Sequence, residues 1–576
     1  MDRLIQRRAE PNTDLTASGL HPLLARVYAG RGIESADELA LGLGRLLPPD
    51  TLHRADEAGV LLADAIQSDS RILVVGDYDA DGATSSALAL TALRAMGSTQ
   101  VDYLVPNRFD YGYGLTPEIV ALAEPREPDL IITVDNGISS IDGIEAARAA
   151  GISTLVTDHH LAGSQLPRAD VIVNPNQPGC DFASKALAGV GVVFYCLLAL
   201  RAELRRRNWF GDHRQEPNLA DYLDLVALGT VADVVPLDRN NRILVNAGLE
   251  RIRAGRARPG ILALLELAGR NPARIVASDL GFTVGPRLNA AGRLDDISIG
   301  IECLLTDDLG RARSFASTLN DFNQDRKAIE RGMQESALAH LASLDIDSNT
   351  VPPMAICLYD PEWHEGVVGI LASRIKDRLH RPTIAFADGS DGNLKGSARS
   401  IKGIHIRDVL DAVATRHAGL VTKFGGHAMA AGLSLAPENF QAFQQAFIEE
   451  VGRHADDVQL NAVIESDGEL AASDFDLALA ETLRYAGPWG QHFPEPVFDG
   501  VFNVVDQRLV GERHLKMVLS LPDGGELIDG IAFNIDTACW PDHSATAVRL
   551  AYRLDVNEWR GRRSVQLMIE HLERSA

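Results

Sequence analysis

The chain has 576 residues, of which 46% are hydrophobic and 23% are charged, a composition typical of globular proteins with several domains. Its 79 acidic residues outnumber its 55 basic residues, which gives a formal net charge of −24. That charge argues against a protein that coats nucleic acid through its overall charge, although it is compatible with a local basic groove.

The N-terminal residues contain no apolar segment of the kind that a secretory signal requires. The longest apolar run, 186–200, is too short to span a bilayer comfortably and fits a buried helix better. The five cysteines are scattered without a CxxC pair, so we expect reduced and mostly buried thiols. These features together predict a cytoplasmic protein with no membrane segment.

Short helical patterns broken by glycine and proline predict a helical N-terminal lead-in over residues 1–50. From residue 51 to about 240, apolar runs alternate with helical patterns, which predicts an α/β domain with a parallel sheet covered on both faces. The expected strands are Ile72–Val75, Val101–Val105, Leu130–Val134, Thr154–Thr157 and Val171–Val173.

The segment 71–95 places acidic residues directly after the first of these strands. Asp77, Asp79 and Asp81 occupy alternate positions and are followed by Gly82. Carboxylates this close repel one another and are costly to bury unpaired, so a cation is expected beside them. Hard oxygen ligands at a strand end suit Mg²⁺ or Mn²⁺ better than zinc. The alternative is an acidic turn exposed to solvent.

Later strands of the same region also end in ionisable residues. Asp135 follows the strand at 130–134, and Asp158-His159-His160 follow the strand at 154–157. Because open α/β sheets bind ligands outside the carboxyl ends of their strands, these residues should converge at one cleft. Asp233, a single acid in the apolar run ALGTVADVVPL, is a further candidate for a strand end. So many ligands indicate two divalent ions with one bridging carboxylate, although each histidine by itself could be a core or surface residue.

The order and spacing of these motifs resemble those of the DHH phosphoesterase superfamily. The matching stretches are GDYDADG, VDNG, TDHH and TVADVVPL. PRLNAAGRL (286–294) and KFGGHAMAAG (423–432) further resemble the RecJ branch, the single-strand-specific 5′→3′ exonucleases. The resemblance extends from about residue 50 to the C-terminus and departs from the family at no metal-ligand position. It implies a DHH catalytic domain at 51–305, a connecting helix at 306–346, a DHH-associated substrate-binding domain at 347–458 and a C-terminal domain at 459–576.

The resemblance also implies a catalytic centre with two Mn²⁺ or Mg²⁺ ions that share Asp135. One ion would be held by Asp77, Asp79 and Asp135. The other would be held by Asp81, Asp135, His159 and Asp233, although this division could be permuted. The ions would activate water for in-line attack on phosphorus. His160 would contact the scissile phosphate, and Asp158 would orient His159.

Further motifs supply candidate substrate contacts. The segment 281–294 is either an ordinary loop rich in glycine and proline or a phosphate-contacting loop, and the resemblance favours the second. A terminal 5′-phosphate would be read by Arg399 beside Ser397, or by Arg108 after the second strand. The expected substrate-binding residues are Arg108, Arg287, Asn289, Arg293, Ser397, Arg399, Gly425, Gly426 and His427.

The remaining segments connect and extend these domains. Residues 309–344 lack helix breakers and predict a long connecting helix, and DSNTVPP (347–353) marks a boundary. From about residue 460 the pattern changes to short strands that suggest an OB barrel. Single strands could bind there through basic residues and through stacking on Tyr552 and Trp559, and the alternative is a solvated basic face. The basic residues are Lys516, Arg549, Arg553, Arg560, Arg562 and Arg563.

We therefore expect an enzyme that degrades single-stranded DNA from the 5′ end by two-metal hydrolysis. The family relationship suggests a role in DNA recombination and repair, a single-stranded-DNA-binding protein as partner and a monomeric state. One rival is a DHH enzyme that acts on small substrates, which would need neither a second lobe nor a barrel. The other rival is a scaffold that binds single strands without catalysis, which the retained metal ligands disfavour.

Overall fold

The computed structural model describes residues 3–9, 13–16, 19–107, 111, 114–343, 353–455, 460–559 and 561–575. The described residues form two compact units, which are considered separately. One unit contains residues 8–322 and 466–576, and the other contains residues 1–7 and 323–465. Within the described residues, no helix has both the length and the apolar character that crossing a membrane requires.

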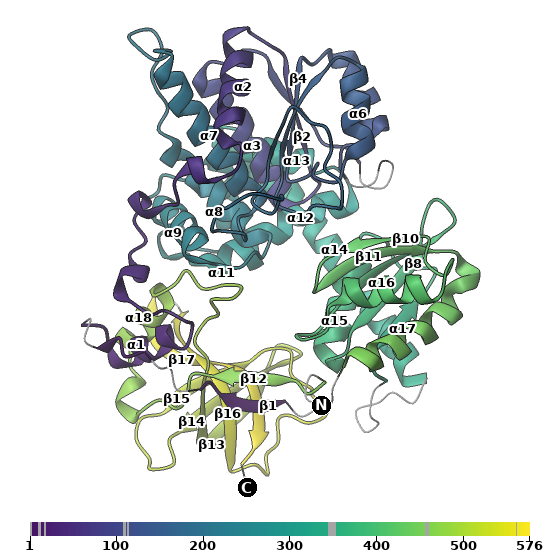
Figure 1. Cartoon of the computed structure of the whole chain (residues 1–576). Coiled ribbons are helices and arrows are strands. Elements are labelled where there is room, and N and C mark those ends of the chain that lie inside the picture. The colour runs from purple at the N-terminus through teal and green to yellow at the C-terminus, as the bar shows by residue number, and fades with distance from the viewer. Residues whose placement is uncertain are drawn as a thin grey trace. The chain divides into compact units, whose positions relative to one another are not determined.

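The parallel sheet predicted for the first unit is confirmed, and its strands β2 and β4 are labelled in Figure 1. The strand order is β3-β2-β4-β5-β6. Alternate residues of β2 face opposite sides, because Val74 belongs to the core shared with α2, α3 and α7, whereas Leu73 belongs to the core shared with α5 and α6. The sheet is therefore buried on both faces. Its strands are β2 (Ile72–Gly76), β3 (Val101–Leu104), β4 (Leu130–Val134), β5 (Ser153–Thr157) and β6 (Val171–Val173). The covering helices are α2 (Ala55–Gln67), α3 (Ala80–Met96), α5 (Pro117–Ala123), α6 (Ile141–Ala149) and α7 (Gly189–Arg206).

Helices follow the sheet along the chain, and two of them correct the predictions. Asp233 does not end a strand but caps the C-terminus of α8, a mostly buried ten-residue helix that includes the first six residues of the apolar run 227–237. The glycine-rich segment 281–294 is not a loop: it forms the π-helical turn η8 (Leu280–Val284) and α12. The helices of this part are α8 (Leu223–Ala232), α9 (Arg239–Arg253), α10 (Pro259–Leu267), α11 (Ala277–Asp279), α12 (Gly285–Leu294) and α13 (Ser298–Leu305).

The long connecting helix is confirmed as α14 (Leu309–Ser343), which continues from the first unit into the second. The predicted boundary at 347–353 lies outside the described residues except for its last position. The second unit has a sheet with strand order β10-β11-β9-β8-β7, in which β7 and β8 are parallel and the other pairs antiparallel. Its elements are β7 (Ile356–Tyr359), α15 (Val368–Leu379), β8 (Thr383–Asp388), β9 (Leu394–Arg399), α16 (Ile406–Arg416), β10 (Lys423–Gly426), β11 (Ala430–Leu435) and α17 (Phe440–His454).

The C-terminal segment of the first unit forms the expected closed barrel, with strand order β13-β14-β15-β17-β16. Tyr552 corrects a prediction: its ring is buried in the barrel core against Phe475 and Phe502, so it cannot stack on a base. The side chain of Trp559 and the whole of Arg560 lie outside the described residues. The elements are α18 (Leu477–Tyr485), β13 (Phe498–Val510), β14 (His514–Ser520), β15 (Ile528–Ala532), β16 (Ala547–Trp559) and β17 (Arg562–Arg574).

Carboxylates lie beside most of the basic residues predicted for the barrel. Lys516 pairs with Asp529 at 3.1 Å, and Arg549 lies 3.5 Å from Glu573. Arg553 pairs with Glu570 and Glu495, and Arg563 pairs with Glu481. The described basic side chains of the barrel are therefore largely neutralised within the protein, and Arg562 is exposed. This arrangement weakens the prediction of a basic strand-binding face.

The N-terminal residues are only partly helical, which corrects the predicted lead-in. Helix α1 (Pro22–Ala29) and short 3₁₀ turns are present, but β1 (Leu4–Arg7) is a strand that pairs with β12 (Val463–Ser466). Pairing with a distant strand overrides local helical propensity there.

The loop before the barrel is fixed to α1 and α9 by stacked rings and guanidinium groups. Arg31 makes a bidentate ion pair with Asp467, at 2.8 and 3.0 Å, and lies over the ring of Trp489. Arg242 of α9 lies over Phe493, which stacks on Trp489. Because both side chains of the ion pair are buried, the loss of one leaves the other charge unpaired.

We expect Asp467→Ala to lower the free energy of unfolding of the first unit by about 3–5 kcal/mol, because it leaves Arg31 buried without its carboxylate. Denaturant unfolding followed by tryptophan fluorescence measures the change. The control is Asp523→Ala, which removes an exposed carboxylate and should change stability little. Equal stability of the two variants would contradict a structural role for this ion pair.

Candidate metal centre

The predicted ligands meet at the carboxyl edge of the parallel sheet, where short loops leave adjacent strands. Asp77 directly follows β2, and Asp79 caps the N-terminus of α3 by accepting hydrogen bonds from the amides of Asp81 and Gly82, at 2.9 and 3.0 Å. Asp135 directly follows β4 and has a left-handed backbone with φ of 62°. A positive φ is uncommon for a residue other than glycine and is found where the surrounding structure imposes it.

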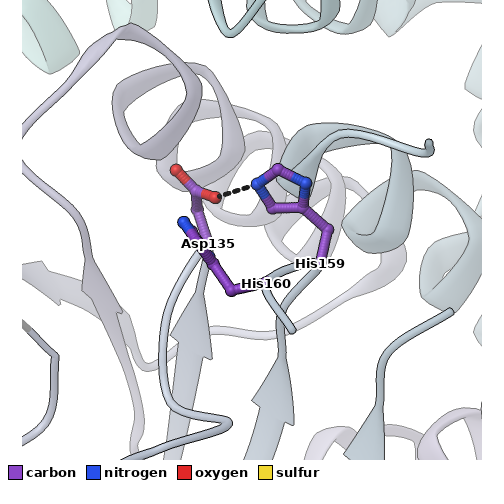
Figure 2. Close-up of side chains that lie close together, drawn as sticks. All are labelled: Asp135, His159 and His160. Atoms are coloured by element: carbon purple, nitrogen blue, oxygen red, sulfur yellow. Dashed lines mark ion pairs between the residues drawn. The ribbon is translucent and has the colours of Figure 1, made fainter. Parts of the chain in front are cut away.

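The two histidines follow β5 and differ in their surroundings. Figure 2 shows the His159 ring directed at the Asp135 carboxylate, and its Nε2 lies 3.1 Å from Asp135 Oδ1. The same nitrogen lies 3.5 Å from Asp233 Oδ2. The ring of His160 instead approaches Asp158, with Nδ1 2.7 Å from Oδ1. Asp158 therefore orients the His160 ring and contacts only the backbone amide of His159, which corrects the predicted pairing.

The ligand atoms of this cluster are close enough to share cations. Each of three sets offers atoms that lie within 4.8 Å of one another, a spacing that suits ligands around one metal ion. The sets are Asp77, Asp79 and Asp135; Asp81, His159 and Asp233; and Asp135, His159 and His160. The first set equals the predicted ligands of one ion, and the second contains three of the four predicted ligands of the other. Asp135 belongs to the first and third sets, and its Oδ1 lies 3.1 Å from His159 of the second set, so its bridging role stays a prediction.

Electrostatics explains why this cluster favours cations. Burial, and then the charges of Asp81 and the neighbouring aspartates, raise the pKa of Asp135 well above its usual range. Burial, and then the charge of Asp233, likewise raise the pKa of Asp81, although the amides of Gly189 and Val190 oppose this shift. Divalent cations would relieve the repulsion, and the hard oxygen donors with one imidazole suit Mn²⁺ or Mg²⁺. The donor set therefore fits the metals expected from the sequence.

The histidines have opposite protonation tendencies. Burial lowers the pKa of His159, which keeps the ring neutral, the form that ligates metals. Burial also lowers the pKa of His160, but the hydrogen bond and the charge of Asp158 outweigh it and raise the pKa to about 9. His160 is therefore cationic near neutral pH and suited to contact an anionic group.

Backbone amides and asparagines that the sequence analysis did not single out support these ligands. The amides of Gly189 and Val190, at the N-terminus of α7, donate to the two oxygens of Asp81 at 2.7 and 2.9 Å. Asn174 and Asn176 donate to the carbonyl oxygens of His160 and His159, at 2.9 and 2.6 Å. Both asparagines follow β6, so the rule that strand ends converge at one edge could have identified them.

The segment 281–294 packs against the loop that carries Asp79 and Asp81 rather than forming an open phosphate loop. Asn289 Oδ1 accepts a hydrogen bond from the amide of Ala80, at 2.7 Å. Arg287 donates to the carbonyl oxygen of Thr283 and to Asn320, at 2.6 and 3.2 Å, so it contacts protein groups. Arg293 is half-buried in the last turn of α12. The predicted phosphate contacts of these three residues stay predictions.

Comparisons with known proteins agree with this geometry. Three family models match the chain: the DHH family N-terminal domain at 71–230, the DHHA1 domain at 352–453 and the RecJ OB domain at 466–571. The chain is 57% identical to the single-stranded-DNA-specific exonuclease RecJ of Dickeya dadantii, over 99% of this chain and 98% of that protein. It is 55% identical to the protein of the same name from Escherichia coli, over 99% of each.

The chain belongs to the RecJ family of single-stranded-DNA-specific exonucleases. Solved RecJ structures share its fold, and that of Thermus thermophilus RecJ in complex with Mn²⁺ matches with a TM-score of 0.81 at 30% identity. That match covers 100% of this chain and 80% of the other. The complex of the same protein with Mg²⁺ matches with a TM-score of 0.76 at 28% identity, over 100% and 79%. Both metals expected here are thus found in RecJ structures.

The substrate-binding residues predicted for the second unit lie on its sheet. Ser397 and Arg399 belong to β9, and Gly425 and Gly426 to β10 rather than to a loop. His427 follows β10 and is exposed. Their contacts with substrate stay predictions, and Arg108 lies outside the described residues.

Glycine at position 189 lets the start of α7 and the segment that carries Asp135 approach each other closely. A Cβ on Gly189 would lie 2.7 Å from both Cβ and Oδ1 of Asp135, closer than real side chains come. The position therefore needs glycine because of the close approach of Asp135, and this constraint yields a test of the bridging role.

We expect Gly189→Ala to lower exonuclease activity about a hundredfold, because its methyl group would displace Asp135 by a fraction of an ångström or more. Initial rates of nucleotide release at saturating Mn²⁺ measure the effect. The control is Gly211→Ala, since a Cβ there would meet nothing within 4 Å. If Gly189→Ala retained full activity with an unchanged fold, Asp135 would not need its present position for catalysis.

Proposed function

We propose that the chain degrades single-stranded DNA from the 5′ end by hydrolysing phosphodiester bonds with two divalent metal ions, in DNA recombination and repair. The observation that carries the proposal is the cluster of carboxylates and histidines at the sheet edge, in a member of the RecJ family. Mn²⁺ or Mg²⁺ would be held by Asp77, Asp79 and Asp135 at one position. At the other position the ligands would be Asp81, Asp135, His159 and Asp233.

Bound divalent ions supply an activated water molecule and stabilise negative charge on the attacking and leaving oxygens. The protein's own side chains contribute the remaining functions. Asp158 accepts a hydrogen bond from His160 Nδ1, which holds the imidazole in one orientation and keeps it cationic. Nε2 on the opposite side of the ring would then donate to the scissile phosphate. His159 is kept neutral by burial and can ligate a metal.

The proposed function is tested with a single strand labelled at its 5′ or 3′ end. We expect the 5′ label to be released before the 3′ label in Mn²⁺, and neither label to be released in EDTA. Asp135→Ala should lower the rate of hydrolysis more than about a thousandfold, since the bridging carboxylate would serve both metal positions. Mn²⁺ should raise the melting temperature of the wild type but not of this variant.

Circular dichroism shows whether Asp135→Ala keeps its fold. Wild-type turnover by a well-folded Asp135→Ala protein would contradict the two-metal mechanism. Release of the 3′ label first would contradict the proposed 5′→3′ polarity. Hydrolysis of dinucleotides but not of longer strands would favour the alternative of a DHH enzyme that acts on small substrates.

Arg399 is the preferred candidate for reading a 5′-phosphate. Its guanidinium donates to Ser397 Oγ and to the carbonyl oxygen of Ala398, at 3.0 and 2.8 Å. Among the described residues, no carboxylate lies within ion-pair distance of this guanidinium, and burial lowers its pKa. A partly buried arginine that makes no ion pair can bind a phosphate without first breaking an ion pair. Gly369 leaves room for it, since a Cβ there would lie 2.8 Å from the guanidinium.

We expect Arg399→Ala to slow digestion of 5′-phosphorylated strands about ten- to a hundredfold, which corresponds to a loss of about 1.5–3 kcal/mol of charge-assisted hydrogen bonding. Strands with a 5′-hydroxyl should be affected less, so the informative quantity is the ratio of the two rates. The control is Arg378→Ala, which removes an exposed arginine near the end of α15. Equal slowing of both substrates would assign Arg399 to backbone binding or to structure.

Further aspects of the function follow from family membership and are part of the proposal. The enzyme would act in the cytoplasm as a monomer, and a single-stranded-DNA-binding protein would be its partner. Pull-down with that protein and sedimentation of the purified chain test these two points.

A further inference from the structure

A large apolar side chain is exposed to solvent on the helical segment that packs against the metal centre. Phe282 is 85% exposed, which makes it the most exposed large hydrophobic residue in the described part of the chain. Most exposed apolar side chains need no explanation, but a phenylalanine with almost its whole ring in water is unusual. It belongs to η8, a π-helical turn, and such turns are frequent at functional sites.

The segment that carries Phe282 runs along the metal centre from one ligand loop to another. At its C-terminal part, Asn289 accepts a hydrogen bond from Ala80, and a Cβ on Gly292 would collide with the carbonyl oxygen of Tyr78. At its N-terminal part, a Cβ on Gly281 would lie 3.0 Å from Val231, and one on Gly285 would lie 3.1 Å from Ala232. Val231 and Ala232 are the last two residues of α8 before the ligand Asp233, so the segment that carries Phe282 packs against the helix end that carries this ligand.

A second exposed apolar residue directly follows the same ligand. Val234 is 63% exposed and has a φ of 63°, in the left-handed region that β-branched residues rarely adopt. A residue held in this conformation is strained, and such residues cluster at active sites and ligand clamps. Exposed apolar side chains thus occur directly after Asp233 and on the segment that packs against the end of α8.

The chemistry of the adjacent centre points to what covers this surface. The nucleobases that flank a phosphodiester bound at the metal positions lie beside the metal centre. Every base has an apolar face. Aromatic side chains bind single strands by stacking on such faces without sequence preference. A protein partner would instead require a larger apolar area and would block the centre.

We propose that Phe282, together with Val234, forms a nucleobase-binding subsite that positions the strand for hydrolysis of the neighbouring phosphodiester. This proposal rests on the proposed exonuclease function. The ligand is a base of the single strand near the scissile bond, bound through its aromatic face and without discrimination among the four bases.

The test combines substitution of Phe282 with removal of single bases from the substrate. Strands carry one abasic nucleotide at successive positions from the 5′ end, and kcat/KM is measured for each strand. For the wild type, we expect an abasic nucleotide at one particular position to lower kcat/KM about tenfold. Phe282→Ala should lower kcat/KM by a similar factor on intact strands and should be insensitive to the abasic nucleotide at that position. Phe282→Trp should restore both properties, which a merely structural role would not produce.

Two controls separate this subsite from general effects. Leu122→Ala removes an exposed apolar side chain near the C-terminal end of α5 and should leave activity and base sensitivity unchanged. In the hydrolysis-deficient Asp135→Ala protein, a strand with 2-aminopurine at the sensitive position should be quenched on binding, and adding Phe282→Ala should remove the quenching.

The outcomes distinguish this proposal from the proposed function. If the wild type hydrolyses strands but the effects of Phe282→Ala and the abasic nucleotide simply multiply, the subsite proposal is wrong and the exonuclease remains. A Phe282→Trp protein as slow as Phe282→Ala would likewise overturn it. If the wild type releases no nucleotides, the proposed function fails, and quenching that is independent of Phe282 would then overturn the subsite as well.

Discussion

Repulsion among carboxylates buried at one edge of the parallel sheet is the constraint on which the rest of the first unit depends. Asp81 and Asp135 are almost inaccessible to solvent, and burial together with neighbouring aspartates raises the pKa of each. Such a cluster is unfavourable without cations, yet strand ends, backbone amides and close helix packing hold it together. The fold therefore maintains an arrangement that divalent metal ions complete.

The ligands are held mainly by backbone groups rather than by other side chains. The N-terminus of α7 donates two amides to Asp81, Asp79 accepts amides from its own helix, and Asn289 fixes the loop between them. Glycine at position 189 lets the helix terminus approach Asp135. Backbone donors are rigid and neutral, so they orient a carboxylate without neutralising the charge that the metals need.

The charged side chains of the barrel, in contrast, mostly form ion pairs within the protein. Most of the basic residues predicted to bind a strand there are paired with carboxylates, whereas Arg562 is exposed, so the barrel offers little unpaired positive charge. Long-range attraction for phosphate is therefore weak there, so we expect the binding of a single strand to depend on local polar and apolar contacts. The exposed Phe282, in the first unit, and the partly buried Arg399, in the second, are candidate groups for such contacts.

The sequence by itself determined the strands of the parallel sheet, their order along the chain and the acids and histidines that follow them, because apolar runs and the residues at their ends are local patterns. Parallel strands place their carboxyl ends at one edge, so Asp77, Asp135 and His159 could be brought together without coordinates. Only the tertiary structure decided the rest. Asp233 caps a helix, Asp158 holds His160 instead of His159, segment 281–294 is helical, and Tyr552 is buried. Each of these depends on which distant segment packs against the residue, and neither periodicity nor spacing along one chain contains that information.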